Sequence, residues 1–433
     1  MPESAAEVVV EVGGDDVLAG RLWSHRRRGA ESATFAYDPE YLAHPDAYGL
    51  DPALSLVAGQ QQTATGRATF GAFSDCAPDR WGRLLIARAE RQRAGREGGA
   101  ERSFGEIDYL LGVRDDLRQG ALRFRDPSTG TYLADAESGV PQLVDLPTLL
   151  HAADRFERDE ASEAELRTLL RGGSSLGGAR PKAHVLDSGD RAAIAKFPSR
   201  SGDDWDVMRW ESVALRLARA AGIRVPDCAL HTIDGKAVLI VDRFDRAGHL
   251  RIGYVSAMTM LEANDGDHRS YLEIADVIDL HSPQTTDDLR QLWRRVAFSV
   301  LISNTDDHLR NHGFLRTSSA GWTLSPAFDI NPDPRPGPKH LSTAIDFDDT
   351  TASVDTLIAV AGYFRLDDDQ ARQVLREVSD ATRLWRSAAH EAGLDARELE
   401  QMARAFEHEQ ASRARQIVGP GHGGEGPASG PVR

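Results

Sequence analysis

The amino-acid sequence predicts an α+β fold in which β-rich segments dominate the first part of the chain and helices dominate the last part. Residues 7–37 contain runs of β-branched side chains separated by turn residues, which indicates strands joined by tight turns. Residues 182–197 and 228–241 show a similar pattern. From residue 255 onward the pattern turns helical, with apolar residues three and four positions apart. We therefore expect a small β-rich N-terminal unit, a second β-rich part and a mostly helical C-terminal lobe.

Composition and charge limit the classes of function. Lys and Arg number 51 against 67 Asp and Glu, a formal net charge of -16, so non-specific binding to nucleic acid is not expected. Only Cys76 and Cys228 are present, which excludes a disulfide framework and favours a reducing compartment. The acidic N-terminus lacks the features of an export signal, and no apolar stretch is long enough to span a bilayer. We expect a cytoplasmic protein with no membrane association.

Helices are expected between the two β-rich parts. Pro78 can open a helix in which Trp81 lies at helical spacing from the next leucines, so Trp81 is most simply a core anchor. The charged, glycine-containing residues 93–102 show no apolar periodicity and predict a surface loop. Two amphipathic helices are expected over residues 147–170.

A glycine-rich segment precedes the second β-rich part. Four glycines fall within residues 172–178, and a glycine backbone can approach an anion closely. No Gly-Lys-Ser/Thr follows, so a P-loop NTPase is disfavoured. Strands are expected over residues 182–186 and 191–197, and the second contains Lys196. A lysine placed this way after a glycine loop is typical of sites that bind nucleotide phosphates, whereas alone it would be a strand-end surface residue.

A helix is predicted over residues 206–221 from its apolar spacing. Glu211 lies beside the apolar stripe near the start of this helix. It can pair with Lys196, as a helix glutamate does in kinase sites, or only favour the helix N-terminus electrostatically. After two further strands, residues 242–244 leave the sheet where the adenine of a nucleotide would usually meet the connection between lobes.

The polar segment 301–332 carries the side chains best suited to chemistry. Asp306 and Asn311 are five positions apart, and Asp329 follows a short predicted hairpin. Phosphoryl transfer uses one carboxylate to accept the proton of the attacking hydroxyl, and hard oxygen ligands to hold Mg²⁺ against the phosphates. We assign the first role to Asp306 and the second to Asn311 and Asp329. A solvated turn is the simpler alternative, and the glycine loop and lysine upstream favour the phosphoryl-transfer site.

Neighbouring residues in this segment receive other roles. Asp307 should point away from Asp306, and we expect it to support the site. His308 and His312 lie four apart, as zinc ligands on a helix turn would, but Leu309 stands where a zinc-protease motif has glutamate. We expect His308 instead to brace the loop through hydrogen bonds.

The remaining pattern is helical and ends in a tail. Helices are predicted over residues 257–262, 270–280, 287–303, 354–364, 367–388 and 395–416. The order of glycine loop, strand lysine, Asp306 with Asn311, and then Asp329 is the order in which a kinase carries these features. The expected parts are residues 1–135, the N-terminal β-rich subdomain with a portion of the N-lobe; 136–245, the nucleotide-binding N-lobe; 246–416, the helical catalytic C-lobe; and 417–433, a disordered tail.

Several separated segments carry a family resemblance. They are SSLGGARPKA, AIAKFP, LIVDRFDR, SNTDDHLRNHGF and PAFDINP, with FAYDPEYLAHPDAYGLDPALSL and FSDCAPDRWGRLL nearer the N-terminus. Together they resemble the HipA-type serine/threonine kinases, the toxin subunits of bacterial toxin–antitoxin modules, over nearly the whole chain except the tail. The resemblance implies a two-lobed protein-kinase-like fold and the use of ATP and Mg²⁺. It also implies transfer of phosphate to a serine or threonine of a protein, in known members often an aminoacyl-tRNA synthetase. It also implies a small helix-turn-helix antitoxin of HipB type, through which DNA would be bound indirectly.

The resemblance also implies roles for individual residues. Asp306 matches the catalytic aspartate, and Asn311 and Asp329 match the metal ligands. The implied nucleotide-binding residues are Lys196, Gly177, Gly178, Lys182, Asp242, Phe244 and His308, and Asp242 stands where a relative can carry glutamate. Glu211 and Asp307 are supporting residues.

Ser175 falls where the family autophosphorylates its glycine-rich loop, which ejects the loop and switches the kinase off. The adjacent Ser174 leaves open which serine is modified. A phosphate on either would place about two negative charges where the ATP phosphates should lie. Unmodified, both are ordinary turn residues.

Two other classes of function stay open at this point. A small-molecule phosphotransferase of similar architecture would share the catalytic residues and differ only in its acceptor. A non-catalytic scaffold that binds a transcriptional regulator would need none of them, and the presence of all four chemical positions argues against it.

Overall fold

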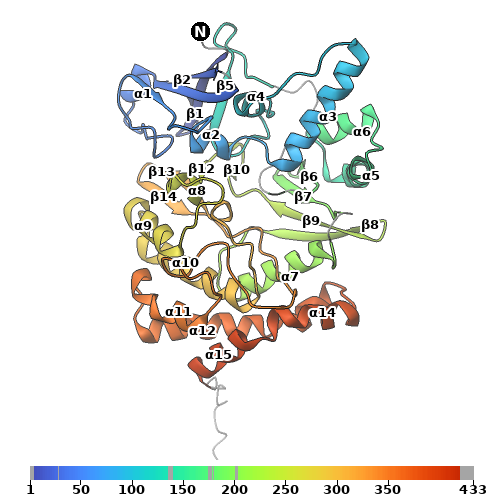
Figure 1. Cartoon of the computed structure of the whole chain (residues 1–433), viewed down its shortest axis with the longest axis vertical. Helices are drawn as coiled ribbons and strands as arrows, with labels where there is room; N and C mark the ends of the chain where they lie inside the picture. The colour runs from blue at the N-terminus through green and yellow to red at the C-terminus, as the bar shows by residue number, and fades with distance from the viewer. Residues whose placement is uncertain are drawn as a thin grey trace, which may run out of the picture.

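The computed structural model describes residues 4–27, 29–134, 140–173, 178, 180–199 and 203–419. The molecule is elongated, with a β-sheet at the N-terminal end, a second sheet in the middle and helices at the other end (Figure 1). The N-terminal sheet has the antiparallel strand order β4 (Gln60–Gln62), β3 (Ala30–Tyr37), β2 (Asp15–Arg27), β1 (Ser4–Val12) and β5 (Leu122–Arg125). Between β1 and β2, Gly13 and Gly14 have φ of 64° and 96°, as a two-residue hairpin of this hand requires.

Four helices lie in the chain between the strands of this sheet, namely α1 (Pro39–Leu42), α2 (Gly71–Asp75), α3 (Arg80–Glu97) and α4 (Glu106–Leu111). The prediction of a surface loop over residues 93–102 was wrong for residues 93–97, because α3 continues to Glu97. Arg93 lies 2.6 Å from Glu90 and also pairs with Glu97. Such ion pairs three and four positions apart stabilise a helix turn that has no apolar stripe.

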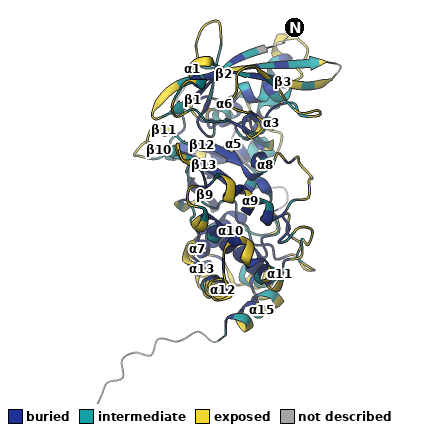
Figure 2. Ribbon diagram, turned by 90° about the vertical axis from the view of Figure 1, so that its left-hand side faces the viewer, coloured by how far each residue is buried: buried dark blue, intermediate teal, exposed yellow. Residues whose placement is uncertain are grey.

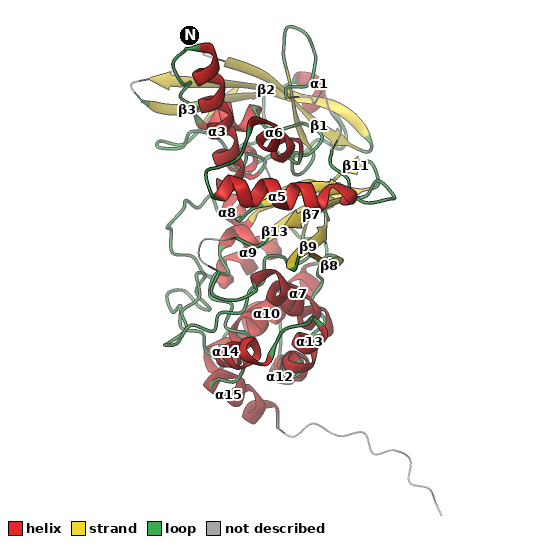
Figure 3. Cartoon of the chain, turned by 90° about the vertical axis from the view of Figure 1, so that its right-hand side faces the viewer, coloured by secondary structure: helices red, strands yellow, loops and turns green. Residues whose placement is uncertain are grey.

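The middle sheet has the antiparallel order β6 (Lys182–Leu186), β7 (Ala192–Lys196), β9 (Lys236–Asp242) and β8 (Cys228–Ile233). Helices α3, α5 (Leu146–Glu157) and α6 (Glu163–Arg171) pack on one face, where Trp81, Leu149 and Val185 belong to a single apolar cluster. Figure 3 shows α5 running alongside β7 and β9. Helix α7 (Val207–Ala220) contacts β8 and β9 and belongs to the main core cluster.

The C-terminal part is mostly helical around a small sheet of β12 (Gly253–Ser256), β13 (Gly313–Ser318) and β14 (Gly321–Leu324), and β13 and β14 form the expected hairpin. Short strands β10 (Arg246–Ala247) and β11 (Leu250–Arg251) precede it. The helices are α8 (Ala257–Met260), α9 (Tyr271–His281), α10 (Thr285–Leu301), α11 (Val354–Ala359), α12 (Asp368–Thr382), α13 (Trp385–Glu391), α14 (Ala396–Phe406) and α15 (Glu409–Val418). Short 3₁₀ turns are η1 (Leu143–Asp145), η2 (Leu309–Asn311) and η3 (Ala361–Phe364).

Two long helices were each predicted as continuous, but each is divided into two helices in the structure. Residues 367–388 form α12 and α13, and residues 395–416 fall in α14 and α15. The second break follows from a cap, because His408 accepts a hydrogen bond from the N–H of Ala411 and starts a new helix. Helix α15 ends at Val418, slightly inside the expected tail, and residues 420–433 lie outside the described residues.

Helix α10 is the centre of the C-terminal core. Its buried residues include Leu292, Val296 and Phe298, and Figure 2 shows the buried interior around it. Burial of such side chains stabilises the fold by roughly 1.5–3 kcal/mol each. Among the helices that the structure describes, none has both the length and the apolar character needed to cross a bilayer.

Candidate active site

The strand lysine Lys196 lies at the centre of a partly buried charge cluster. It ends β7, and its Nζ is 2.5 Å from Glu211 Oε1 and 2.9 Å from Asp329 Oδ1. Glu211 lies on α7 and is only 2% exposed. Of the two predicted uses of Glu211, the structure has the ion pair with Lys196. One ammonium therefore joins the middle sheet, α7 and the segment after β14.

The contacts in the cluster shift the pKa values of Lys196 and Asp329 towards the charged forms of both groups. Burial alone would lower the pKa of Lys196, but Asp329 and Glu211 outweigh it and raise that pKa. Burial likewise opposes ionisation of Asp329, yet Lys196 and then Lys182 hold the pKa of Asp329 at about 2. Asp329 also has a left-handed backbone, with φ of 56°, a conformation that Asp and Asn tolerate better than most residues and that recurs at functional sites.

The loop after α10 holds Asp306 and Asn311 together. Asn311 Nδ2 donates a hydrogen bond of 3.0 Å to the backbone oxygen of Asp306, which leaves the amide oxygen of Asn311 for another partner. The Asp306 side chain is exposed, but the surrounding protein excludes enough water to raise its pKa. His308 opposes this rise, and the carboxylates of Asp329 and Asp307 add to it.

Asp307 points into the protein, away from Asp306. Its carboxylate accepts hydrogen bonds from Tyr271 Oη at 2.6 Å and Ser299 Oγ at 3.1 Å, and it lies 3.2 Å from His312 Nε2. Burial raises the pKa of a carboxyl, but His312 and these donors outweigh it and lower the pKa of Asp307. The buried contact with Asp307 favours a structural role for His312.

Both backbone polar groups of His308 form hydrogen bonds within the loop. Its N–H donates to the Asp306 carbonyl at 3.0 Å, and its carbonyl accepts from the N–H of Asn311 at 2.8 Å. The expected side-chain brace is not seen at Nδ1, which is buried with no hydrogen-bond partner among the described residues; Asn331 Oδ1 is in the same state. Buried polar atoms without a partner favour a bound ligand or water near them.

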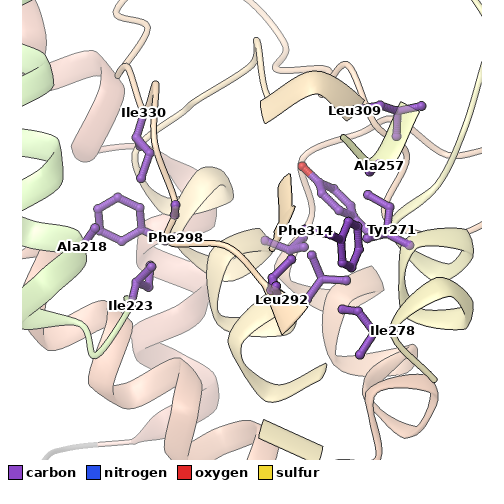
Figure 4. Packing of buried hydrophobic residues seen from close by; sticks show 14 of the residues in the cluster. Ala218, Ile223, Ala257, Tyr271, Ile278, Leu292, Phe298, Leu309, Phe314 and Ile330 are labelled. Carbon is purple, nitrogen blue, oxygen red and sulfur yellow. The ribbon is translucent and has the colours of Figure 1, made fainter. Parts of the chain in front are cut away.

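Apolar residues hold both acidic segments in place. Leu309 and Ile330, which adjoin the site residues, lie among the buried side chains of the core cluster with Phe314 and Tyr271 (Figure 4). The loop is also tied to the following segment, because Thr343 Oγ1 donates to the Asp307 carbonyl at 2.8 Å. The site thus rests on packed elements rather than on a free loop.

A cavity of about 940 Å³ opens beside the cluster. Its lining includes Lys196, Glu211, Asp329, Gly178, Asp242, Phe244, Ile194, Val241 and Phe328. The rings of Phe244 and Phe328 lie 5.4 Å apart and give this side of the cavity an apolar wall suited to a planar base. Asp306 and Asn311 lie outside this lining.

The residues fit ATP and Mg²⁺ in their chemistry. Asn311 and Asp329 offer the hard oxygen ligands that Mg²⁺ prefers, and Lys196 offers a cation for phosphate. In the described part of the chain, no group of three or more His, Cys, Asp or Glu side chains is arranged to hold a metal.

Lys182 has partners that sequence reasoning missed. Its Nζ lies 2.8 Å from Asp79 Oδ2, and its carbonyl accepts a hydrogen bond of 3.0 Å from Trp81 Nε1. Trp81 is buried, as expected, but Asp79 carried no signal beyond its place before a helix. The predicted loop residues Gly177, Ser174 and Ser175 lie outside the described residues.

The fold has a close counterpart among solved structures. HipA of Shewanella oneidensis MR-1, solved with HipB and its operator DNA, matches 95% of this chain and 97% of its own with a TM-score of 0.65 and 18% identity. The proinflammatory kinase CtkA of Helicobacter pylori matches 56% of this chain and 92% of its own, with a TM-score of 0.44 and 17% identity. The mixed α/β architecture therefore defines a protein of the HipA fold class.

Family models identify the chain further. The model of the HipA-like C-terminal domain matches residues 174–411, and that of the HipA N-terminal domain matches residues 10–104. The chain belongs to the HipA family.

Two curated relatives are putative kinases. That of Sinorhizobium fredii is 28% identical over 153 residues, which is 32% of this chain and 36% of the relative. That of Haemophilus influenzae is 25% identical over 135 residues, which is 28% and 39%. The match thus spans little more than a third of each relative's length.

Proposed function

We propose that this chain is an ATP-dependent serine/threonine protein kinase and the toxin component of a bacterial toxin–antitoxin module. The observation that carries the proposal is the contact of Lys196 with both Glu211 and Asp329 at the edge of the cavity. Phosphoryl transfer requires a positioned cation at the phosphates and oxygen ligands for Mg²⁺. Membership of the HipA family and the kinase names of two relatives support it.

Each residue has a defined task in this mechanism. When bound, MgATP supplies the transferable phosphoryl group and the cation that offsets its charge. Phe244 and Asp242 would contact the base, and Lys196 would hold phosphate oxygens while Glu211 orients its ammonium. Asn311 and Asp329 would hold Mg²⁺.

Asp306 would take the proton of the acceptor hydroxyl onto its carboxylate as the hydroxyl oxygen bonds to the γ-phosphorus and the bond from that phosphorus to the leaving ADP breaks. Its exposed side chain suits contact with a protein substrate. Asp307, which is buried and hydrogen-bonded, would keep the loop in place without touching substrate.

The partners follow from the family. The solved HipA of Shewanella oneidensis is in complex with HipB and operator DNA, and we extend to this chain a helix-turn-helix antitoxin of HipB type. The net charge of -16 agrees with DNA contact through that partner. The protein acceptors would be an aminoacyl-tRNA synthetase or another cellular protein, and the chain itself at Ser175 or Ser174.

Labelling tests the proposal directly. Purified protein incubated with radiolabelled MgATP should label itself within residues 172–182, as located by mass spectrometry, and Asp306→Ala should abolish the label. Unchanged labelling of that variant would refute the assignment. Transfer to a sugar or an aminoglycoside, with no protein acceptor labelled in a cell extract, would identify a small-molecule phosphotransferase instead. Absence of ATP binding by calorimetry would favour a non-catalytic scaffold.

A further inference from the structure

Two residues at the start of helix α3, Asp79 and Trp81, contact Lys182. Lys182 opens β6 and lies opposite Lys196 of β7 in the strand pair. Its side chain is 3% exposed and is paired with Asp79, which is 6% exposed. The carbonyl of Lys182 accepts the hydrogen bond of Trp81 Nε1. Residues about a hundred positions upstream therefore fix both the ammonium and the backbone of Lys182.

The carboxylate of Asp79 is itself held in place. As the N-cap of α3, it accepts a hydrogen bond of 2.8 Å from the N–H of Gly82 through Oδ1, and its other oxygen, Oδ2, faces Lys182. The following residues Trp81 and Leu85 are buried in the cluster that covers the middle sheet. The position of the carboxylate is thus set by a capped helix on a packed sheet.

Lys182 contacts the lining of the cavity through Asp79 without being part of that lining itself. Asp79 and Gly178 both line the cavity together with Lys196. A Cβ placed on Gly178 would lie 3.4 Å from Lys182 Nζ, so Gly178 lies beside this ammonium. The positive charge of Lys182 also helps to lower the pKa of Asp329.

We propose that Asp79 is a positioning residue for nucleotide binding, which holds the ammonium of Lys182 beside Gly178 at the wall of the cavity, within reach of the phosphates of a bound ATP. A buried ammonium needs a counter-ion to stay charged and ordered, and a cation that is already ordered loses less entropy when it meets a phosphate. The N-terminal half of the chain would in this way set the affinity for the phosphates of ATP. The inference rests on the proposed use of ATP.

Comparison of two ligands isolates this role. Asp79→Asn keeps an oxygen that can cap α3 but removes the carboxylate charge. We expect it to weaken binding of MgATP about tenfold, with binding of adenosine, which has no phosphates, unchanged. Both dissociation constants are measured by calorimetry. Lys182→Gln should show the same pattern, and the double variant should bind no more weakly than either single variant.

Control variants separate positioning from folding. Asp395 is the N-cap of α14 and has no ion pair within the described residues, so Asp395→Asn is a matched change and should leave both constants unaltered. Asp79→Glu, which keeps the charge, should restore part of the MgATP affinity. Equal weakening of MgATP and adenosine by Asp79→Asn, or no weakening of either, would overturn the proposal. If the unaltered chain binds no MgATP, the proposed function fails first and this role with it.

Discussion

Glu211 and Lys196 meet between helix α7 and strand β7, with 2.5 Å between Oε1 and Nζ. Asp329 approaches the same ammonium from the segment after β14, at 2.9 Å. Because both contacts are partly buried, movement of any one of these elements would separate charges that water solvates only in part. The arrangement therefore couples the geometry of the cavity to the packing of the C-terminal helices.

Removal of the Glu211 charge should disable the site without unfolding the protein. In Glu211→Gln, Lys196 keeps Asp329 as counter-ion but loses the partner that orients it, and misplacement of such a group can lower a transfer rate on the order of 100-fold. The rate of self-labelling with MgATP is the measurement. Glu400→Gln, on the exposed face of α14, is the control and should keep the full rate. A Glu211→Gln protein with an unchanged rate would show that the ion pair has no part in transfer.

Asp306 and Asp307 should differ in what they support. Asp306→Asn removes an exposed carboxylate, so we expect unaltered stability and a transfer rate lowered about 10²–10⁴-fold, as for loss of a general base. Asp307→Asn leaves buried donors without a carboxylate and should lower the free energy of unfolding by about 1–3 kcal/mol. Urea unfolding and self-labelling of both variants separate the two effects. If Asp306→Asn lowered the stability and Asp307→Asn lowered only the transfer rate, the roles assigned to the two residues would have to be exchanged.

Local pattern was enough to predict much of this site. The bounds of β6, the strand lysine and the hairpin before Asp329 all follow from turn residues and alternation, and the structure confirms these elements. The helix breaks near residues 383 and 407 could not be predicted, because the apolar periodicity continues across them.

The contact of Asp79 with Lys182 joins positions 103 apart in the chain. An acidic residue before a helix predicts an N-cap, and nothing local predicts the lysine that it meets. Such a partner is set by how α3 packs on the middle sheet, which is a property of the whole fold.

The charge of Asp329 should contribute to stability in a pH-dependent way. Its pKa in the folded protein is about 2, below the ordinary 3.8, so its stabilising effect is present above the ordinary value and is lost as pH falls through about 2. Asp329→Asn removes the charge and suits the positive φ of this position. The difference in unfolding free energy between the unaltered protein and this variant should be constant from neutral pH to about 5 and shrink below about 4. A difference that grows on acidification would contradict the assigned charge.

Asn311 should set the requirement for magnesium. Its Nδ2 is used in the hydrogen bond to the Asp306 carbonyl, so its oxygen is the atom available to a cation. In Asn311→Ala we expect the Mg²⁺ concentration for half-maximal self-labelling to rise on the order of tenfold. A residue that only braces the loop would instead lower the maximal rate at every Mg²⁺ concentration. Recovery of the rate in excess Mg²⁺ therefore assigns Asn311 to the cation, and failure to recover assigns it to the support of Asp306.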